Sequence, residues 1–326
     1  PSFSPDKGSS ITAPSGFGLA VHYIDVGQGD SILAESDGHY MLIDAGENDQ
    51  AGTVISYLKA QGVTKLDYVI GTHPHSDHIG GLDKVIDTFP VDKVILPPVE
   101  HTTKTFEDVL DSIASRGLKI TKPTPGDSYD LGDASFTILS PVKDYGSDLN
   151  NWSVGVRLTF GDNSFVMCGD AENQAEEDIV KNGAMLKADV LKAGHHGSST
   201  STSDAFLKKV SPSWVVIQCG KGNSYGHPHK ETMEKLKKRA ARYCAQTRRE
   251  PLPHSVTARQ LHGVPALPRF PASAPAAAAI RQPLSQTLTT GPQLKMSRQS
   301  LHTLQLCHKY QHRQIPPPRL RLCPPR

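Results

Sequence analysis

The sequence THPHSDHIGG at positions 72–81 carries the strongest structural signal in this chain of 326 residues. It follows an apolar segment, Tyr68 to Ile70, that has the composition of a buried strand, and its two glycines favour the start of a helix. Three histidines and an aspartate lie within six positions, and imidazole nitrogens and carboxylate oxygens are ligands that Zn²⁺ and Mn²⁺ accept. The stretch therefore predicts a metal site at a strand end, with a surface histidine cluster as the alternative.

The spacing of these residues suits two neighbouring ions. His73 and His75 are two positions apart in an extended segment, so both rings can approach one ion. Asp77 and His78 follow on the next turn and point to a second ion. The sequence therefore predicts two divalent cations, Zn²⁺ or Mn²⁺, at this place.

Two later apolar segments end in residues of the same kind. FVMC at positions 165–168 runs into Gly169 and Asp170, and VLKA at 190–193 runs into GHHGS at 194–198. A carboxylate at a strand tip can bridge two cations, although alone it would be an ordinary turn residue. Because functional groups commonly converge where strands end at one edge of a sheet, we expect all three segments to contribute to one site.

These motifs resemble the metallo-β-lactamase superfamily. Other motifs narrow the resemblance to the metallo-hydrolase domain of ComEC-type competence proteins and its stand-alone relatives: IDVGQGDS at 24–31, LIDAG at 42–46, NNWS at 150–153 and YGHPH at 225–229. The resemblance extends over residues 17–239. It implies a four-layer αββα sandwich with a binuclear metal site at one edge.

The resemblance also implies the ligand set. The two ions would be held by His73, His75, Asp77, His78, Asp170 and His196. In that set His73 and His75 bind the first ion and Asp170 bridges the pair. Either His195 or His196 completes the second site.

Three further aspartates are candidates for supporting these ligands. The resemblance implies that Asp44 lies behind a ligand histidine, where a carboxylate fixes the tautomer and orientation of the ring. Asp25 and Asp30 lie on either side of the glycine-rich turn at 27–29. Each of them either hydrogen-bonds a ligand or the attacking water, or belongs only to the turn.

One segment departs from the lactamase-type and glyoxalase-type members of the superfamily. Those members supply a third histidine to the first ion, whereas this sequence has NNWS at 150–153 and no histidine between His101 and His195. The ComEC-type resemblance expects this absence. It leaves the first ion more open, which makes Mn²⁺ a candidate beside Zn²⁺. His227 or His229 could compensate.

The expected reaction is hydrolysis of a phosphodiester, of nuclease type, by a hydroxide that bridges the two ions. The candidate catalytic residues are Asp77, His195, His196 and His227, and the candidate substrate contacts are Asn151 and Ser198. One of the histidines would protonate the leaving oxygen. The alternatives are a hydrolase of a small or cell-wall phosphoester and a metal-binding module without turnover. Lactam hydrolysis is disfavoured because the third histidine is missing.

Composition divides the chain into unlike parts. Residues 1–16 are rich in Ser, Pro and Gly and predict a flexible arm before the domain at 17–239. Residues 1–240 hold 22 Lys and Arg against 32 Asp and Glu, a net charge of −10, whereas residues 241–326 hold 13 against 1, a net charge of +12. The segment 240–326 is rich in Arg and Pro and lacks apolar periodicity. It therefore predicts a disordered tail, arising from a shifted reading frame or a fused segment, and a sandwich without its final strands.

The same features bear on partners and location. No stretch approaches the roughly 18–20 consecutive apolar residues of a membrane-spanning helix. The acidic domain would repel a nucleic acid duplex, so a single strand is the easier partner among phosphodiesters. The arm before Phe17 fits a mature N-terminus, so a secreted or cell-surface protein is expected, with a cytoplasmic one as the alternative. The sequence leaves the oligomeric state open.

Strand-like and helix-like segments alternate along residues 17–239. Strands are expected at 18–26, 31–34, 40–43, 66–71, 93–96, 135–139, 153–160, 164–168, 190–193 and 214–219, and helices at 54–58, 82–89, 106–113, 173–180, 203–210 and 230–239. Cys168 and Cys219 each end an apolar run and are expected to be buried thiols. The five cysteines have no ligand-like spacing, so they predict neither a disulfide framework nor a cysteine zinc site.

Overall fold

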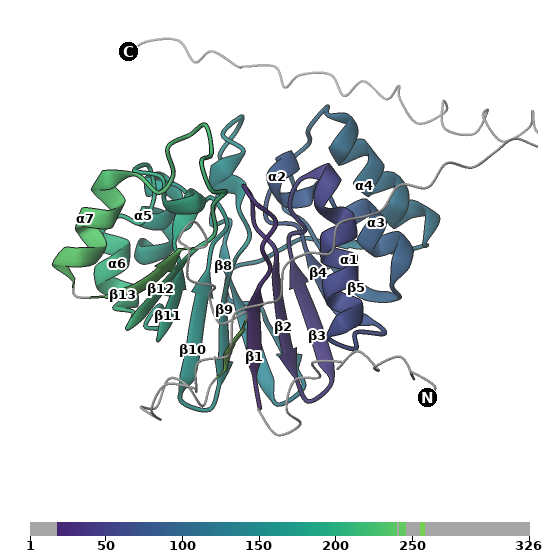
Figure 1. Cartoon of the computed structure of the whole chain (residues 1–326), viewed down its shortest axis with the longest axis horizontal. Coiled ribbons are helices and arrows are strands. Elements are labelled where there is room, and N and C mark those ends of the chain that lie inside the picture. Colours follow the sequence, from purple (N-terminus) through teal and green to yellow (C-terminus); the bar gives the residue numbers. More distant parts are fainter. Residues whose placement is uncertain (1–17, 240, 246–254, 258–326) are drawn as a thin grey trace, which may run out of the picture. The chain divides into compact units, whose positions relative to one another are not determined.

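The computed structural model describes residues 18–239, 241–245 and 255–257, which form two facing β-sheets covered by helices (Figure 1). In these residues each sheet has seven strands. The first sheet has the order β14-β1-β2-β3-β4-β5-β6, made of Ser255–Thr257, Ala20–Tyr23, Ile32–Ser36, His39–Ile43, Leu66–Ile70, Val91–Ile95 and Ile120–Thr121. The second has the order β13-β12-β11-β10-β9-β8-β7, made of Arg242–Ala245, Trp214–Ile217, Val190–Lys192, Asn163–Met167, Gly155–Phe160, Ala134–Ser140 and Ser128–Leu131.

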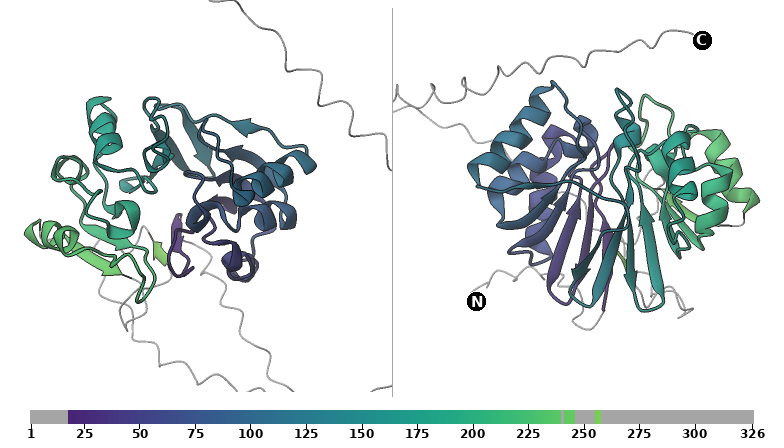
Figure 2. Two further views of the ribbon diagram at one scale, coloured as in Figure 1. Left: turned by 90° about the horizontal axis from the view of Figure 1, so that it is seen from above. Right: turned by 180° about the vertical axis from the view of Figure 1, so that it is seen from behind.

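Helices lie on the outer face of each sheet (Figure 2). The first sheet is covered by α1 (Ala51–Ala60), α2 (Ser76–Ile79), α3 (Leu82–Thr88) and α4 (Lys104–Ser115). The second is covered by α5 (Asn173–Lys181), α6 (Asp204–Val210) and α7 (Lys230–Lys238). None of these described helices is long and apolar enough to cross a membrane.

The two-residue period of the strands produces three apolar layers. In β3, Met41 and Ile43 face the second sheet, whereas Leu42 faces the helices. In β10, Phe165 lies between the sheets and Val166 lies under the helices. These side chains are buried, and burying one large apolar side chain stabilises the fold by about 1.5–3 kcal/mol. The described residues therefore form the four-layer αββα sandwich that the sequence predicts.

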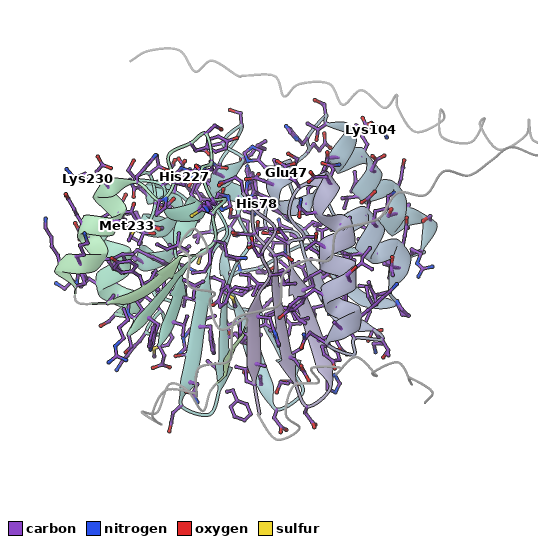
Figure 3. The ribbon with its side chains drawn as sticks, in the orientation of Figure 1. Glu47, His78, Lys104, His227, Lys230 and Met233 are labelled. Atoms are coloured by element: carbon purple, nitrogen blue, oxygen red, sulfur yellow. The ribbon has the colours of Figure 1, made fainter. Side chains whose placement is uncertain are left out.

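The strand directions bring the predicted ligands to one edge of the sandwich. β3 and β4 are parallel, as are β10, β11 and β12. The segments that follow β4, β10 and β11 therefore leave the two sheets at the same edge, where His78 and His227 lie (Figure 3). This is the edge that the sequence analysis expects to carry the site.

Some elements differ from the sequence-based expectation. The short strands β6 and β7 are partly exposed and give no strong apolar pattern. Beyond residue 239, where disorder is expected, β13 pairs parallel to β12 and β14 pairs antiparallel to β1. The open edges of β12 and β1 supply these pairings, and a local sequence pattern does not reveal them. The rest of the expected arm and tail (1–17, 240, 246–254 and 258–326) lies outside the described residues.

Candidate metal centre

The loop after β4 and the short helix α2 present the first ligands. His75 is the last extended residue before α2, and its carbonyl accepts hydrogen bonds from His78 N and Ile79 N. A Cβ on Gly80 would lie 2.3 Å from Asn48 N, and one on Gly81 would lie 2.6 Å from Ala45 O. The glycine pair therefore permits the close approach of α2 to the loop after β3.

His73 and His75 form one half of the centre. His73 Nε2 lies 2.9 Å from His75 Nδ1. Thr72 Oγ1 donates to Asp44 Oδ2 at 2.8 Å and lies 3.1 Å from His73 Nδ1, which can therefore donate to it. Ser153 Oγ is 3.4 Å from the same Nδ1. With its Nδ1 engaged, His73 directs the lone pair of Nε2 toward the site.

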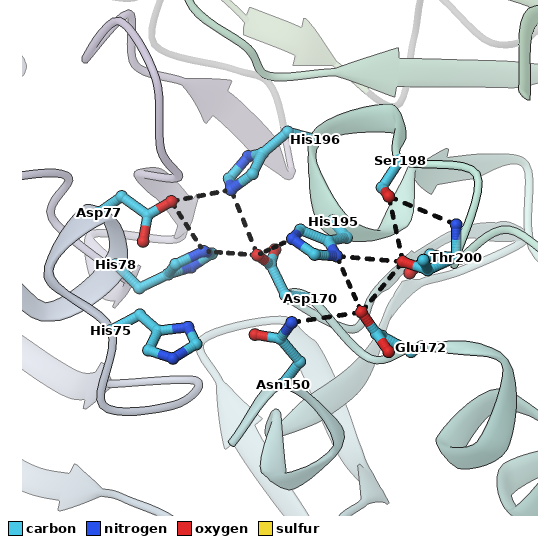
Figure 4. Close-up of polar contacts among 12 residues, drawn as sticks. His75, Asp77, His78, Asn150, Asp170, Glu172, His195, His196, Ser198 and Thr200 are labelled. Atoms are coloured by element: carbon cyan, nitrogen blue, oxygen red, sulfur yellow. Dashed lines mark hydrogen bonds and ion pairs between the residues drawn. The ribbon is translucent and has the colours of Figure 1, made fainter. Parts of the chain in front are cut away.

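Asp170 is the centre of the other half (Figure 4). Its Oδ2 lies 3.2 Å from His78 Nε2, 3.3 Å from His196 Nε2 and 3.6 Å from His195 Nε2. Asp77 Oδ2 lies 3.2 Å from His196 Nε2 and 3.9 Å from His78 Nε2. Carboxylates from two strand ends thus converge on the same imidazole nitrogens.

Buried groups behind two histidines fix their orientation. Asp44 accepts hydrogen bonds from Thr72 N and Oγ1, both at 2.8 Å, and its Oδ2 lies 2.8 Å from His78 Nδ1. His196 Nδ1 donates to Gln218 O at 3.1 Å and lies 3.3 Å from Asp30 Oδ1. In both rings Nδ1 is engaged, so Nε2 is left to face Asp170.

The electrostatics of the centre favour positive charge. Burial opposes ionisation of Asp170, but His196 and His78 outweigh it and hold the pKa of Asp170 well below its usual range. Burial likewise opposes protonation of His78, but Asp170, Asp77 and Asp44 outweigh it and raise the pKa of His78 well above its usual value. A divalent ion would neutralise the same negative charge as those protons, and it would compete with them for the histidine nitrogens.

The residues fit a pair of divalent ions. His78 Nε2 and Asp170 Oδ1 are buried without a hydrogen-bond partner in the described part of the chain. Ligand atoms of Asp30, His78, Asp170 and His196 lie within 4.8 Å of one another. Asp30 also pairs with Lys192, so we assign it to holding His196 rather than to an ion. Nitrogen and oxygen donors of this kind suit Zn²⁺ or Mn²⁺.

Lys192 is a buried cation that the sequence analysis does not identify as part of the site. Its Nζ pairs with Asp30 Oδ2, lies 3.8 Å from Asp170 Oδ1 and donates to Gly169 O at 3.3 Å. Burial opposes the charge, but Asp30 and Asp170 outweigh it and raise the pKa of Lys192. It therefore neutralises part of the negative charge of the carboxylate cluster.

Glu172 is a second residue that the sequence analysis does not identify. Its Oε1 lies 3.3 Å from His195 Nδ1 and accepts hydrogen bonds from Thr200 Oγ1 at 3.0 Å and from Asn150 Nδ2 at 3.3 Å (Figure 4). His195 Nε2 then faces Asp170. The signal in the sequence is the position of Glu172, two residues after Asp170 in the motif GDAE.

The backbone at the histidine pair is strained. His195 has φ 47° and His196 has φ 53°, in the left-handed region that non-glycine residues rarely adopt. Such a conformation costs about 1–2 kcal/mol per residue and persists at functional sites where the surroundings enforce it. Here it turns both rings toward Asp170.

Three predicted residues have other roles. Asp25 is exposed, and its carboxylate accepts a hydrogen bond from Gly27 N at 3.1 Å, so it belongs to the turn. Asn151 is buried; its Oδ1 accepts from Glu172 N at 3.0 Å and Ala175 N at 3.2 Å, which caps α5. Ser198 is buried too, and its Oγ accepts from Thr200 N at 3.3 Å. All three side chains are used within the protein.

The two late histidines differ in availability. The ring of His227 lies 5.5 Å from that of His195 and 6.1 Å from that of His196, and its Nδ1 is buried without a hydrogen-bond partner among the described residues. Burial and the neighbouring histidines lower the pKa of His227 to about 4. His229 is engaged at both nitrogens, by Ser199 and by Tyr225 O. His227 is therefore the one whose ring can serve the site.

Comparisons with known proteins agree with this geometry. Residues 24–220 match the family model described as Metallo-beta-lactamase superfamily. The chain is 31% identical over 240 residues to ComE operon protein 3 of Bacillus subtilis, covering 68% of this chain and 31% of that protein. It is 30% identical over 221 residues to Recombination protein 2 of Haemophilus influenzae, covering 66% of this chain and 26% of that protein. The chain thus spans about a third or less of the length of these relatives.

The solved structures compared with this chain include one metallo-beta-lactamase fold protein of Bacillus subtilis. The crystal structure of the metallo-beta-lactamase fold protein YhfI from Bacillus subtilis has a TM-score of 0.47 at 15% identity, covering 70% of this chain and 95% of that chain. The family model matches more than half of the chain, and the αββα layers carry histidines and carboxylates at one edge. The chain belongs to the metallo-β-lactamase superfamily, whose members are generally hydrolases, and its relatives include competence-related proteins.

Proposed function

We propose that the protein is a binuclear metal-dependent phosphodiesterase of nuclease type. The observation that carries this proposal is the identity of about 30% with ComE operon protein 3, Recombination protein 2 and Competence protein ComA, relatives whose names refer to competence and recombination. The centre described above supports hydrolysis. A phosphodiester is the substrate class common to such functions.

The segment NNWS supports a phosphodiesterase over a lactamase. Asn150 contacts Glu172, Asn151 caps α5, and Ser153 Oγ accepts a hydrogen bond from Asp170 N at 3.0 Å. The segment therefore holds the site together but offers no third imidazole to the ion at His73. An ion held by His73 and His75 would therefore have fewer protein ligands and could accept a phosphoryl oxygen.

The candidate ligands form two groups, one for each ion. His73 and His75 would hold one ion, Asp170 would lie between the two, and Asp77, His78 and His196 would hold the other. When bound, two divalent ions lower the pKa of a coordinated water and stabilise charge on phosphoryl oxygens. The protein supplies their positions and excludes bulk water, since most of these side chains are buried.

His195 is placed to exchange a proton with the leaving oxygen. Its Nε2 faces the centre, 3.6 Å from Asp170 Oδ2, while Glu172 and Thr200 engage its Nδ1. A carboxylate at Nδ1 orients the ring and stabilises the imidazolium that precedes proton donation. We therefore assign the role of general acid to His195 and that of positioning residue to Glu172.

The test combines metal analysis with a substrate panel. The purified chain, loaded with Mn²⁺ or Zn²⁺, is incubated with single-stranded DNA, bis-p-nitrophenyl phosphate, a phosphorylcholine ester and a chromogenic cephalosporin. We expect about two ions per chain and cleavage of the first two substrates. His75→Ala and Asp170→Ala should abolish turnover, whereas His39→Ala, which removes a half-exposed histidine paired with Asp67, should not.

Three outcomes would contradict the proposal. The first is a metal analysis that finds less than half an equivalent of metal per chain, with no gain on adding Zn²⁺ or Mn²⁺. That result would show that these residues do not form a metal centre. Cephalosporin hydrolysis without phosphodiesterase activity would show that the substrate is a lactam rather than a phosphodiester. Turnover of the phosphorylcholine ester alone would favour a small phosphoester, which the net charge of −10 on residues 1–240 makes the second candidate.

A further inference from the structure

Tyr225 is an exposed aromatic side chain beside the metal centre. The exposed large apolar side chains among the described residues are Tyr225, Met185 and Ile120, at 64%, 70% and 46% exposure. Of these, Tyr225 contacts the site: its ring stacks on that of His227, with the centroids 5.6 Å apart and the planes 19° from parallel. The ring of His227 in turn lies 5.5 Å from that of His195 and 6.1 Å from that of the candidate ligand His196.

The loop that carries Tyr225 is held in one conformation. Asn223 Oδ1 accepts hydrogen bonds from Tyr225 N at 3.1 Å and from His227 N at 3.0 Å, while its Nδ2 donates to Gly220 O at 2.8 Å and to His227 O at 2.7 Å. His229 Nε2 lies 3.0 Å from Tyr225 O. The backbone of Tyr225 is thus fixed on both sides although its ring is largely in water. This preorganisation reduces the entropy that binding would cost.

We propose that Tyr225 is a stacking platform for the nucleobase next to the scissile phosphodiester. The inference rests on the proposed function and names its substrate class, a single-stranded nucleic acid. Aromatic side chains bind single strands by stacking on successive bases with little sequence preference, because every base has a π face. In a duplex those faces are already stacked on one another, so a single strand is the form that can use this ring.

A cationic headgroup is the other ligand that an exposed tyrosine could bind. Quaternary ammonium groups are recognised by cages of several aromatic rings. Among the residues that the structure describes, the ring in contact with that of Tyr225 is His227, which stacks on one of its faces. One remaining open face matches a flat base, which needs a single partner plane.

The experiment compares oligonucleotides that differ only in their bases. One is an ordinary single-stranded DNA; in the other, the nucleosides around a single cleavable linkage are abasic, so the phosphodiester is kept and the base is lost. The value measured is the ratio of kcat/KM for the ordinary strand to that for the abasic strand. We expect a ratio of about 5 or more for the wild type, since a stacked base contributes about 1–3 kcal/mol and about 1.4 kcal/mol corresponds to a factor of ten.

Variants at Tyr225 test whether the aromatic ring causes the difference in kcat/KM between the two strands. Tyr225→Ala and Tyr225→Leu should bring the ratio close to one, whereas Tyr225→Phe and Tyr225→Trp should keep it, because they retain a π face. Met185→Ala is the matched control: it removes an equally exposed apolar side chain from a loop after α5 and should leave the ratio unchanged. Metal content and the unfolding midpoint are measured for each variant, so that a folding defect is recognised.

The outcomes separate the two proposals. A wild-type ratio near one, or a Tyr225→Ala variant that keeps the wild-type ratio, overturns the stacking role and leaves the phosphodiesterase in place. A selective loss of activity toward a phosphorylcholine ester in Tyr225→Ala would assign the ring to a cationic headgroup and likewise overturn it. A wild type that binds two ions but cleaves neither oligonucleotide overturns the proposed function and this inference together.

Discussion

Replacing Lys192 with methionine tests how the charge of the metal centre is balanced. The side chain of Lys192 is fully buried, and its Nζ contacts Asp30 Oδ2, Asp170 Oδ1 and Gly169 O. Methionine keeps most of the volume and removes the charge. Breaking a buried ion pair by removing one partner costs about 3–5 kcal/mol, because the other charge is left uncompensated. We expect the metal-free variant to lose about that much free energy of unfolding.

Bound ions should reduce this loss. A divalent ion at Asp170 supplies positive charge to the carboxylates that have lost Lys192, and the ion no longer meets the repulsion of the ammonium group. The variant should therefore bind ions more tightly than the wild type, and each tenfold gain in affinity adds about 1.4 kcal/mol to its stability in excess metal. The deficit measured with Mn²⁺ should be smaller than that in EDTA by about 1–2 kcal/mol.

The assay is urea unfolding followed by circular dichroism, in EDTA and in excess Mn²⁺. Lys65→Met is the control, because Lys65 is 46% exposed and pairs with Asp92 and Asp67 away from the centre. A surface pair contributes about 0–1 kcal/mol, so the control should lose little and lose it equally in both conditions. A Lys192→Met deficit below about 1 kcal/mol in EDTA, or equal deficits with and without metal, would refute the reasoning.

The remaining predictions concern other parts of the centre and the core. Asp44→Asn should weaken metal binding by about 10- to 100-fold in a chelator competition, because it removes the carboxylate behind His78; unchanged affinity would contradict that role. Gly29→Ala should lower both metal content and stability, because its backbone has φ 132° and a Cβ would lie 2.3 Å from the carbonyl oxygen of Asp77; retention of two ions would argue against it. Burial raises the pKa of Cys168 and raises that of Cys219 to about 11, so both should resist iodoacetamide at pH 8 in the native protein and react in urea, as peptide mapping would reveal; native labelling of either would contradict their burial.

A layered α/β fold and the convergence of the site could be predicted because both follow from local patterns, whereas the αββα order of the layers was implied by the family resemblance. Each ligand segment is an apolar strand that ends in a polar motif, and the strand period already assigns the two faces. Asp44 was expected behind a ligand histidine, and the structure places it 2.8 Å from His78 Nδ1. The resemblance named His195 and His196 without separating their tasks. Their Nδ1 partners differ, since that of His195 lies near Thr200 and that of His196 donates to Gln218 O, which supports different roles for the two rings.

Other features depend on tertiary contacts that a sequence does not display. Lys192 looks like one polar residue within an apolar strand, and its role follows only from the position of Asp30, which lies in another sheet's loop. The side chain of Asn151 is of a kind that can bind a substrate, but its Oδ1 accepts hydrogen bonds from backbone N–H groups at the N-terminus of α5. The strand β13 is defined by its parallel pairing with the open edge of β12. In each case a partner distant in the sequence decides what the residue does.

The charge distribution links the site to the choice of substrate. Residues 1–240 carry a net charge of −10, and four carboxylates lie within or directly behind the centre, the buried ones of Asp30, Asp44 and Asp170 and the partly exposed one of Asp77. Lys192 is buried and already paired with Asp30, so its charge is not available to a phosphodiester. Two divalent ions bring four positive charges to the place where the phosphoryl group must bind. Under the proposed function, binding of an anionic strand would depend on metal occupancy, and the local attraction would favour a single strand that enters end-on over a duplex.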